Sequence, residues 1–246
     1  MPKFNPVKQP RVSDEIMGQL KKAILSGNYR AGEKLPSERE LTDTFQASRV
    51  VVREAIRGLE TAGFVTIRQG PRGGAYVQQL AFDRVYESFF DLFLAGRMSV
   101  AELIQLRQLL QPEVARMAAM NVTKVSAKQL KAALETETGR YRNHAEKVRS
   151  RMATDLVLAQ MCGNRLYQAV AETLTRLTQE IIIAVKPEKV VFHDQREHDA
   201  IVKAVLDKDA PAAAAAMRRH LNSVGAGLVK LEKDFRCKLG VKAVNA

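Results

Sequence analysis

The stretch LPSERELTDTFQASRVVVREAIRGLETAGFVTIRQGPRGGAYV, residues 35–77, carries the signals that decide the fold of the N-terminal part. Ser37 and Glu40 form the S-x-x-E pattern of a capping box, so a short helix is predicted to begin at Ser37 and to end near Gln46. Ser48 can cap a second helix whose apolar residues recur at helical spacing. Two short helices joined by a tight turn are therefore expected.

Sequence on both sides of these helices completes a recognisable order of elements. Upstream, an amphipathic helix is predicted from a cap at Ser13 to a stop at Gly27. Downstream, FVTIR (64–68) and GAYV (74–77) alternate like strands and flank the glycine- and proline-rich turn QGPRG. Helix, helix, turn, helix and hairpin together predict a winged helix-turn-helix domain over residues 1–78.

The rest of the chain has a different sequence pattern: after the hairpin the periodicity is helical, with almost no strand-like alternation. Residues 79–95, including FDRVYESFFDLFL, predict an amphipathic connector, residues 96–236 predict an all-α helical bundle, and residues 237–246 predict a tail. The fold class is therefore mainly α with one small β-hairpin. The bundle helices are predicted at 99–119, 126–147, 150–162, 165–185, 192–207 and 210–235.

Composition sets the broad class of protein. The 246 residues carry a net charge of +12, a basic balance that favours nucleic acid or another anionic partner. No apolar run approaches the ~20 residues of a membrane span, and the N-terminus lacks the apolar segment of a secretory signal. Cys162 and Cys237 lack metal-binding spacing and fit reduced thiols. A cytoplasmic protein that does not contact a membrane is expected.

Arginines on the two short helices indicate what the N-terminal domain binds. In a helix-turn-helix the first turns of the second helix contact base edges in the major groove, and arginine can donate two hydrogen bonds to guanine. Arg49 and Arg53 lie four residues apart, so they share one helix face. The simpler alternative is a solvated surface on which Arg53 pairs with Glu54. Residues 1–78 hold 13 Lys and Arg against 8 Asp and Glu, which favours phosphate attraction.

Residues 10–78 resemble the DNA-binding domain of GntR-family transcriptional regulators. The resemblance rests on LPSERELT, the SR-x-x-VREA helix and the IRQGPRGG hairpin, which occur in the family's order. It implies a homodimer on a palindromic operator in double-stranded DNA. The residues that it implies for operator contact are Arg39, Ser48, Arg49, Arg53, Gln69 and Gly70.

Residues 80–235 resemble the FCD ligand-binding domain of the FadR subfamily, on ELIQLRQLLQPEVARMAA, MCGN and REHDAIVKAVLDKDAPAAAAAMRRHL. Many such domains hold a divalent metal, and His198 and His220 match two of its ligands. Arg151 stands at the usual aspartate position and Asp155 at the usual histidine position. Asp155, His198 and His220 could still hold Zn, Ni or Mn as a three-ligand site. Alternatively, Arg151 and Asp155 could form an ion pair that replaces the metal.

The resemblance also implies a small-molecule effector bound within the bundle. Arg107 lies on the first bundle helix, where a guanidinium suits a carboxylate ligand, although an interhelical salt bridge is the alternative. Together with Arg107, the residues Arg151, Asp155, His198 and His220 form the predicted effector site. A small organic acid is expected, with an acyl-CoA or another acyl compound as the alternative.

Two other functions remain compatible with the residues. A metal-dependent hydrolase could use Asp155, His198 and His220 to activate water, but the sequence shows no general base at a recognisable spacing. An architectural DNA binder would need no effector at all. A transcriptional regulator that is not an enzyme accounts best for the two parts of the chain together.

Overall fold

The computed structural model describes residues 11–78, 83–185 and 195–239. The chain divides into two compact units, Met1–Ala81 and Phe82–Ala246, and each is described by itself. None of the described helices is both long enough and apolar enough to cross a bilayer.

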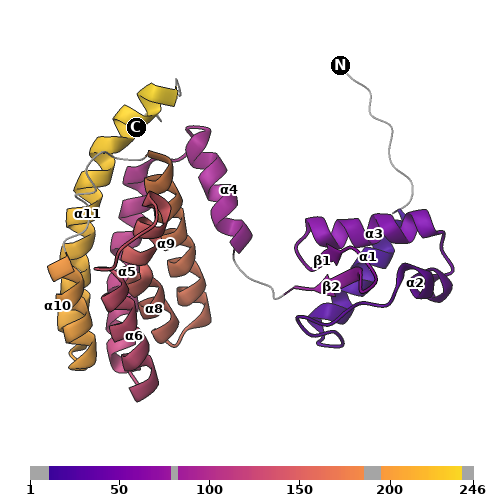
Figure 1. Cartoon of the computed structure of the whole chain (residues 1–246), viewed down its shortest axis with the longest axis horizontal. Helices are drawn as coiled ribbons and strands as arrows, with labels where there is room; N and C mark the ends of the chain where they lie inside the picture. The colour runs from indigo at the N-terminus through magenta and orange to yellow at the C-terminus, as the bar shows by residue number, and fades with distance from the viewer. Residues whose placement is uncertain (1–10, 79–82, 186–194, 240–246) are drawn as a thin grey trace. The chain divides into compact units, whose positions relative to one another are not determined.

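The first unit is a winged helix-turn-helix, as the sequence predicts (Figure 1). Its β-strands form a two-stranded antiparallel hairpin in which the first residue of one strand pairs with the last residue of the other. The elements in chain order are α1 (Val12–Leu25), α2 (Glu38–Phe45), α3 (Arg49–Thr61), β1 (Val65–Arg68) and β2 (Gly74–Val77).

Local capping explains where the short helices begin. The Ser37 side chain accepts a hydrogen bond from the backbone N–H of Glu40, and the Glu40 carboxylate accepts one from the backbone N–H of Ser37, which confirms the capping box. Ser48 caps α3 as predicted. The predicted cap at Ser13 is wrong: α1 begins one residue earlier, and Ser13 is buried in its first turn.

One apolar core holds the first unit together. Leu20 of α1 and Leu59 of α3 are almost completely buried in it, and Val65 brings the hairpin onto the same cluster. Gly58 of α3 allows close approach, because an added Cβ would lie 2.7 Å from the sulfur of Met17. The core therefore fixes α3 on its inner face and leaves its outer face to solvent.

The second unit is all-helical, which confirms the predicted bundle (Figure 1). The predicted single helix over residues 126–147 is wrong, because α6 ends at Thr136 and a second helix begins at His144. The Tyr141 hydroxyl donates to the backbone carbonyl of Thr136 at 3.0 Å and stabilises the turn between them. The helices are α4 (Asp83–Leu94), α5 (Val100–Met120), α6 (Lys124–Thr136), α7 (His144–Arg151), α8 (Ala153–Met161), α9 (Arg165–Val185), α10 (Gln195–Leu206) and α11 (Ala210–Leu239). The first three residues of the predicted helix 192–207 lie outside the described residues.

Helix α5 is the central element of the bundle, with α8, α9, α10 and α11 packed against it. Gly225 lets α11 approach α5 closely, since a Cβ there would lie 2.6 Å from a methyl carbon of Ile104. Every helix that carries a residue of the buried polar site described below thus packs on α5 or on one of its neighbours.

The end of α11 is tied to the junction between α4 and α5. The buried Arg236 guanidinium donates to the backbone carbonyl of Met98 at 2.6 Å and pairs with Glu232. Glu232 in turn accepts a hydrogen bond from the backbone N–H of Val100 at 2.9 Å. Because α4 also packs on α9, the helix that follows the winged domain in sequence is part of the helical unit.

Candidate nucleic-acid interface and buried histidine site

The residues predicted to contact DNA are exposed on the first unit. Arg49 and Arg53 occupy the first and second turns of α3, directly after the Ser48 cap, and Arg39 is exposed in the first turn of α2. The cap orients the start of α3, and the packed inner face prevents it from rotating. The arrangement therefore presents guanidinium groups at the end of α3 that a helix-turn-helix inserts into the major groove.

Arg53 is paired with Glu38 of α2, a partner that the sequence analysis did not identify. The Nε atom of Arg53 lies 3.2 Å from each carboxylate oxygen of Glu38, and its Nη2 atom lies 2.8 Å from Oε2. The hydrogen bond from Arg53 lowers the pKa of the Glu38 carboxyl. The expected neighbour Glu54 instead approaches Arg11 at 3.6 Å.

The hairpin tip carries the predicted wing residues. Gln69 and Gly70 are exposed, and Gly70 has a φ of 96°, a left-handed conformation that favours glycine. The backbone N–H of Gly73 donates to the carbonyl of Gly70 at 2.7 Å and closes the turn. A wing this narrow exposes backbone that can approach a phosphate or a groove closely.

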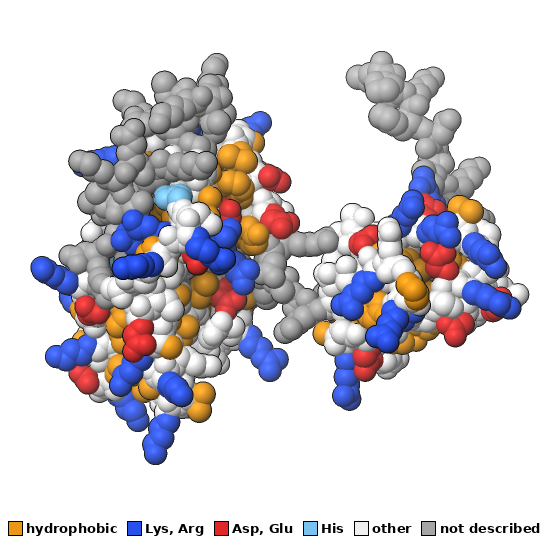
Figure 2. Space-filling view, viewed as in Figure 1, with side chains coloured by type: hydrophobic (Ala, Val, Ile, Leu, Met, Phe, Trp, Pro, Cys, Tyr) orange, Lys and Arg blue, Asp and Glu red, His pale blue; other side chains and the backbone are white. Residues whose placement is uncertain are grey.

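Basic side chains are widely distributed over the described surface. Figure 2 shows Lys and Arg on the visible face of both units, interspersed with acidic side chains. On this face the basic side chains are not confined to the first unit, so the order of α2, α3 and the hairpin carries more information about DNA contact than charge alone.

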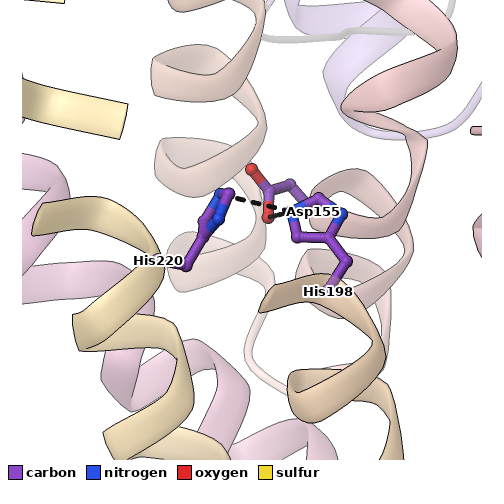
Figure 3. Close-up of side chains that lie close together, drawn as sticks. All are labelled: Asp155, His198 and His220. Atoms are coloured by element: carbon purple, nitrogen blue, oxygen red, sulfur yellow. Dashed lines mark hydrogen bonds and ion pairs between the residues drawn. The ribbon is translucent and has the colours of Figure 1, made fainter. Parts of the chain in front are cut away.

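The second unit contains a buried polar site built from three helices. Asp155 of α8, His198 of α10 and His220 of α11 each offer one ligand atom, and these atoms lie within 4.8 Å of one another. The Nε2 atoms of the two imidazoles are 3.2 Å apart, and the Nε2 of His198 lies 3.9 Å from Oδ1 of Asp155. Figure 3 shows the three side chains pointing toward one another. Residues predicted from distant parts of the sequence thus converge on one point.

Two carboxylates hold the outer nitrogens of the imidazoles. The Nδ1 of His198 lies 2.8 Å from Oε1 of Glu137, and the Nδ1 of His220 lies 3.0 Å from Oε2 of Glu197. A carboxylate at Nδ1 favours a proton there, which directs the lone pair of each Nε2 into the site. Thr154 also donates to Glu137 and fixes that carboxylate.

Arg107 closes the site from α5. Its side chain is fully buried, and its Nη2 donates to Oδ2 of Asp155 at 3.1 Å. Its Nε donates to Gln111 at 2.8 Å and its Nη1 to Thr178 at 3.1 Å. The structure therefore contains the interhelical salt bridge that the sequence left as an alternative role for Arg107.

Arg151 and Asp155 lie on two different helices, although they are only four residues apart in the sequence. Arg151 ends α7 and is half-buried, and Met152, with φ −108° and ψ 8°, separates it from the helix that carries Asp155. Among the described residues, Asp155 forms an ion pair with Arg107 of α5, a partner that the four-residue spacing between Arg151 and Asp155 did not predict.

Burial and neighbouring charges compete at the titratable groups. Burial lowers the pKa of His198, but the hydrogen bond that its Nδ1 donates to Glu137 and the charge of Asp155 outweigh burial, so the pKa of His198 is raised overall. Burial also lowers the pKa of Arg107, against the charge of Asp155. The neighbouring carboxylates therefore favour the protonated form of His198 despite its burial.

Oδ1 of Asp155 is the most informative atom for a ligand. It is buried and has no hydrogen-bond partner among the described residues, although its neighbour Oδ2 is paired. An unpaired buried carboxylate oxygen is costly, so such an atom calls for an explanation such as a bound ion or water. One carboxylate and two imidazoles form a donor set that suits a divalent transition metal, and the Nδ1 atom of each imidazole is already held by a carboxylate.

The sequence analysis did not identify Glu137 and Glu197 as part of this site. Glu197 directly precedes His198, and on a helix adjacent residues point in different directions, so no spacing rule linked them. Glu137 is the C-terminal cap of α6, and the expectation of one continuous helix over 126–147 concealed that position. Because α6 ends at Thr136, Glu137 lies at the helix end, where its carboxylate contacts His198 of α10.

A winged helix-turn-helix joined to a helical unit with a buried polar site defines the class of DNA-binding transcriptional regulators that carry an effector-binding domain. Comparison with known families agrees at both ends of the chain: residues 12–77 match the bacterial regulatory proteins of the gntR family, and residues 102–223 match the FCD domain. The chain belongs to the GntR family. Its combination of a GntR domain and an FCD domain is consistent with the FadR subfamily.

Similar proteins include the HTH-type transcriptional repressor NanR of Citrobacter rodentium, which is 32% identical over 231 residues, covering 90% of this chain and 86% of the relative. NanR of Escherichia coli K12 is 31% identical over the same shares of both chains. Among solved structures, Streptococcus agalactiae GntR superposes with a TM-score of 0.63 and 25% identity, covering 87% of this chain and 99% of that one. The relatives are non-enzymatic regulators, so the hydrolase alternative lacks support.

Proposed function

We propose that this protein is a homodimeric repressor that binds a palindromic operator in double-stranded DNA and responds to a small-molecule effector in its helical domain. The observation that carries the proposal is the exposure of Arg49 and Arg53 on the first two turns of a capped α3. Arg39 and Ser48 complete the contacts from the helices, and Gln69 with Gly70 supplies the wing. Repression and a cytoplasmic location are inferred from the relatives that are named as transcriptional repressors.

The homodimer is supported by an apolar face on α5. Leu106, Leu109 and Met120 are 44%, 79% and 63% exposed, and helical spacing puts them on one side of the helix. Glu113 and Arg116 lie between them and pair with each other at 2.6 Å. A second copy related by a two-fold axis near this pair would match leucine with methionine and exchange the ion pairs, as an isologous interface requires.

The effector site of this proposal is the buried cluster of the helical domain. Asp155, His198 and His220 would hold a divalent metal such as Zn, Ni or Mn, with Glu137 and Glu197 orienting the imidazoles. A bound metal would supply a Lewis-acidic attachment point for a carboxylate or another oxygen donor of the effector.

Arg107 adds positive charge to the same site, and Arg151, at the end of α7, is proposed as a further effector contact. Arg107 orients Asp155 through their ion pair, and an anionic effector would gain from the positive charge of its guanidinium. A small organic acid fits this chemistry best. An acyl-CoA is the second candidate, because buried apolar residues of α5, α8 and α11 surround the polar cluster.

Substitution of the recognition helix tests the DNA-binding part. Duplexes would first be selected from a random-sequence pool with the intact protein, and their dissociation constants measured by fluorescence anisotropy. Arg49→Ala should lose about 1–3 kcal/mol of discrimination between selected and scrambled duplexes, the usual contribution of one bidentate arginine–guanine contact. Lys22→Ala, which removes an exposed charge from α1, is the control. Unchanged discrimination in Arg49→Ala would overturn the assignment of α3.

A thermal-shift screen tests the effector part. Organic acids and acyl thioesters would be added to purified protein with and without chelator. Stabilisation by an organic acid that disappears with chelator supports the metal-assisted site. Stabilisation that survives the chelator favours a metal-free site, and no shift with any compound contradicts the proposed effector class.

A further inference from the structure

A carboxylate lies in the middle of the arginine-rich surface of the first unit. Glu38 is the first residue of α2. Its carboxylate interacts electrostatically with three arginines of α3, which are Arg53, Arg57 and Arg49. A negative charge on a surface that faces DNA phosphates opposes binding. Its presence therefore needs a reason other than affinity.

Stability is a weak reason. The Arg53 and Glu38 side chains are 55% and 40% exposed, and an ion pair at such exposure contributes little to folding because water screens it. The first unit already has its own apolar core, and α2 has its own capping box at Ser37. The pair is not required to hold α2 on α3.

The geometry of the pair provides a better reason. A guanidinium has five N–H donors arranged on a rigid plane. Glu38 contacts Nε and Nη2, which form one edge of the Arg53 guanidinium. The edge formed by Nη1 and the second hydrogen of Nη2 is not used by Glu38. That second edge has the spacing that pairs with O6 and N7 of guanine.

We propose that Glu38 is a specificity-determining positioning residue, which fixes Arg53 through one guanidinium edge so that the other edge reads a guanine in the operator. This inference rests on the proposed function of α3. Without Glu38, the long Arg53 side chain regains rotamer freedom and can turn to phosphates, which carry no sequence information. The carboxylate also repels phosphates, which weakens binding to any duplex and leaves discrimination to the Arg53 contact.

The test compares Glu38→Gln with Asp43→Asn, which removes the same charge from an exposed position of the same helix. Dissociation constants would be measured for a selected duplex and for a scrambled duplex at several salt concentrations. Glu38→Gln should reduce the ratio of the two constants about tenfold, with equal or tighter binding to the scrambled duplex. Asp43→Asn should leave the ratio unchanged. Equal ratios in Glu38→Gln and the unmodified protein would overturn the inference.

Arg53→Ala separates this inference from the proposed function. If Arg53→Ala loses discrimination while Glu38→Gln keeps it, α3 reads DNA but Glu38 does not position Arg53. If neither substitution changes discrimination, the assignment of α3 itself fails. In the Arg53→Ala background, Glu38→Gln should have no further effect on the ratio. A further loss there would mean that Glu38 contacts a base by itself, which also overturns the positioning role.

Discussion

The Nη2 atom of Arg107 lies 3.1 Å from Oδ2 of Asp155, and both side chains are completely or almost completely buried. This pair joins α5 to α8 in the interior of the helical domain. It neutralises one oxygen of Asp155 and leaves the other directed toward His198. Stability and ligand chemistry therefore depend on the same carboxylate.

Breaking this pair should destabilise the helical domain. Arg107→Met leaves Asp155 as an uncompensated buried charge, so we expect the free energy of unfolding to fall by about 3–5 kcal/mol. The double variant Arg107→Met/Asp155→Leu should recover most of the loss, because it removes both charges. Urea denaturation followed by circular dichroism measures both effects. Equal stability of Arg107→Met and the unmodified protein would show that the pair has no net role in folding.

The histidines should control metal content. The unmodified protein is expected to purify with the proposed metal, and His198→Ala and His220→Ala are each expected to purify without it, because each removes one of three donors. Elemental analysis after purification provides the measurement. His144→Ala is the control, since that imidazole lies on α7 beside the backbone carbonyl of Ile182. Metal content that does not change in either site variant would exclude the cluster as the binding site.

The pair between Glu38 and Arg53 should give the first unit a defined pH dependence. The pKa of Glu38 in the folded state lies below its ordinary value of 4.5 because Arg53 donates hydrogen bonds to it. The stabilisation is therefore fully present above pH 4.5 and is lost as the pH falls through the lowered folded-state pKa. Thermal melts should show a small difference between Glu38→Gln and the unmodified protein at pH 7 that disappears in acid. A difference that grows on acidification would contradict the sign.

Close helix packing should make Gly225 sensitive to one added methyl group. Gly225→Ala would bring a Cβ to 2.6 Å from the Ile104 methyl carbon, and the β-branched isoleucine has few rotamers to relieve the contact. We expect a loss of about 1–3 kcal/mol in unfolding free energy, typical of an overpacked core. Ser223→Ala, at an exposed position of the same helix, should change little. A neutral Gly225→Ala would show that α11 can shift away from α5.

Many of the helix and strand boundaries could be predicted from residues that are close together in the sequence. Ser37, Glu40 and Ser48 act within one helical turn, so their effect on the ends of α2 and α3 could be predicted from spacing alone. The alternation of residues 64–68 and 74–77 similarly predicted the hairpin. Prediction failed at Ser13 and between Thr136 and His144, where the boundary depends on what the chain packs against.

The sequence by itself determined the order of elements and the capped start of α3, and it identified Asp155, His198 and His220 as candidate metal donors. Only the tertiary structure decided their partners: Glu38 for Arg53, Arg107 for Asp155, and Glu137 and Glu197 for the two histidines. Helix signals act through neighbours three or four residues away. In contrast, the partners of a charged side chain come from helices packed against it, and that packing is a property of the whole core.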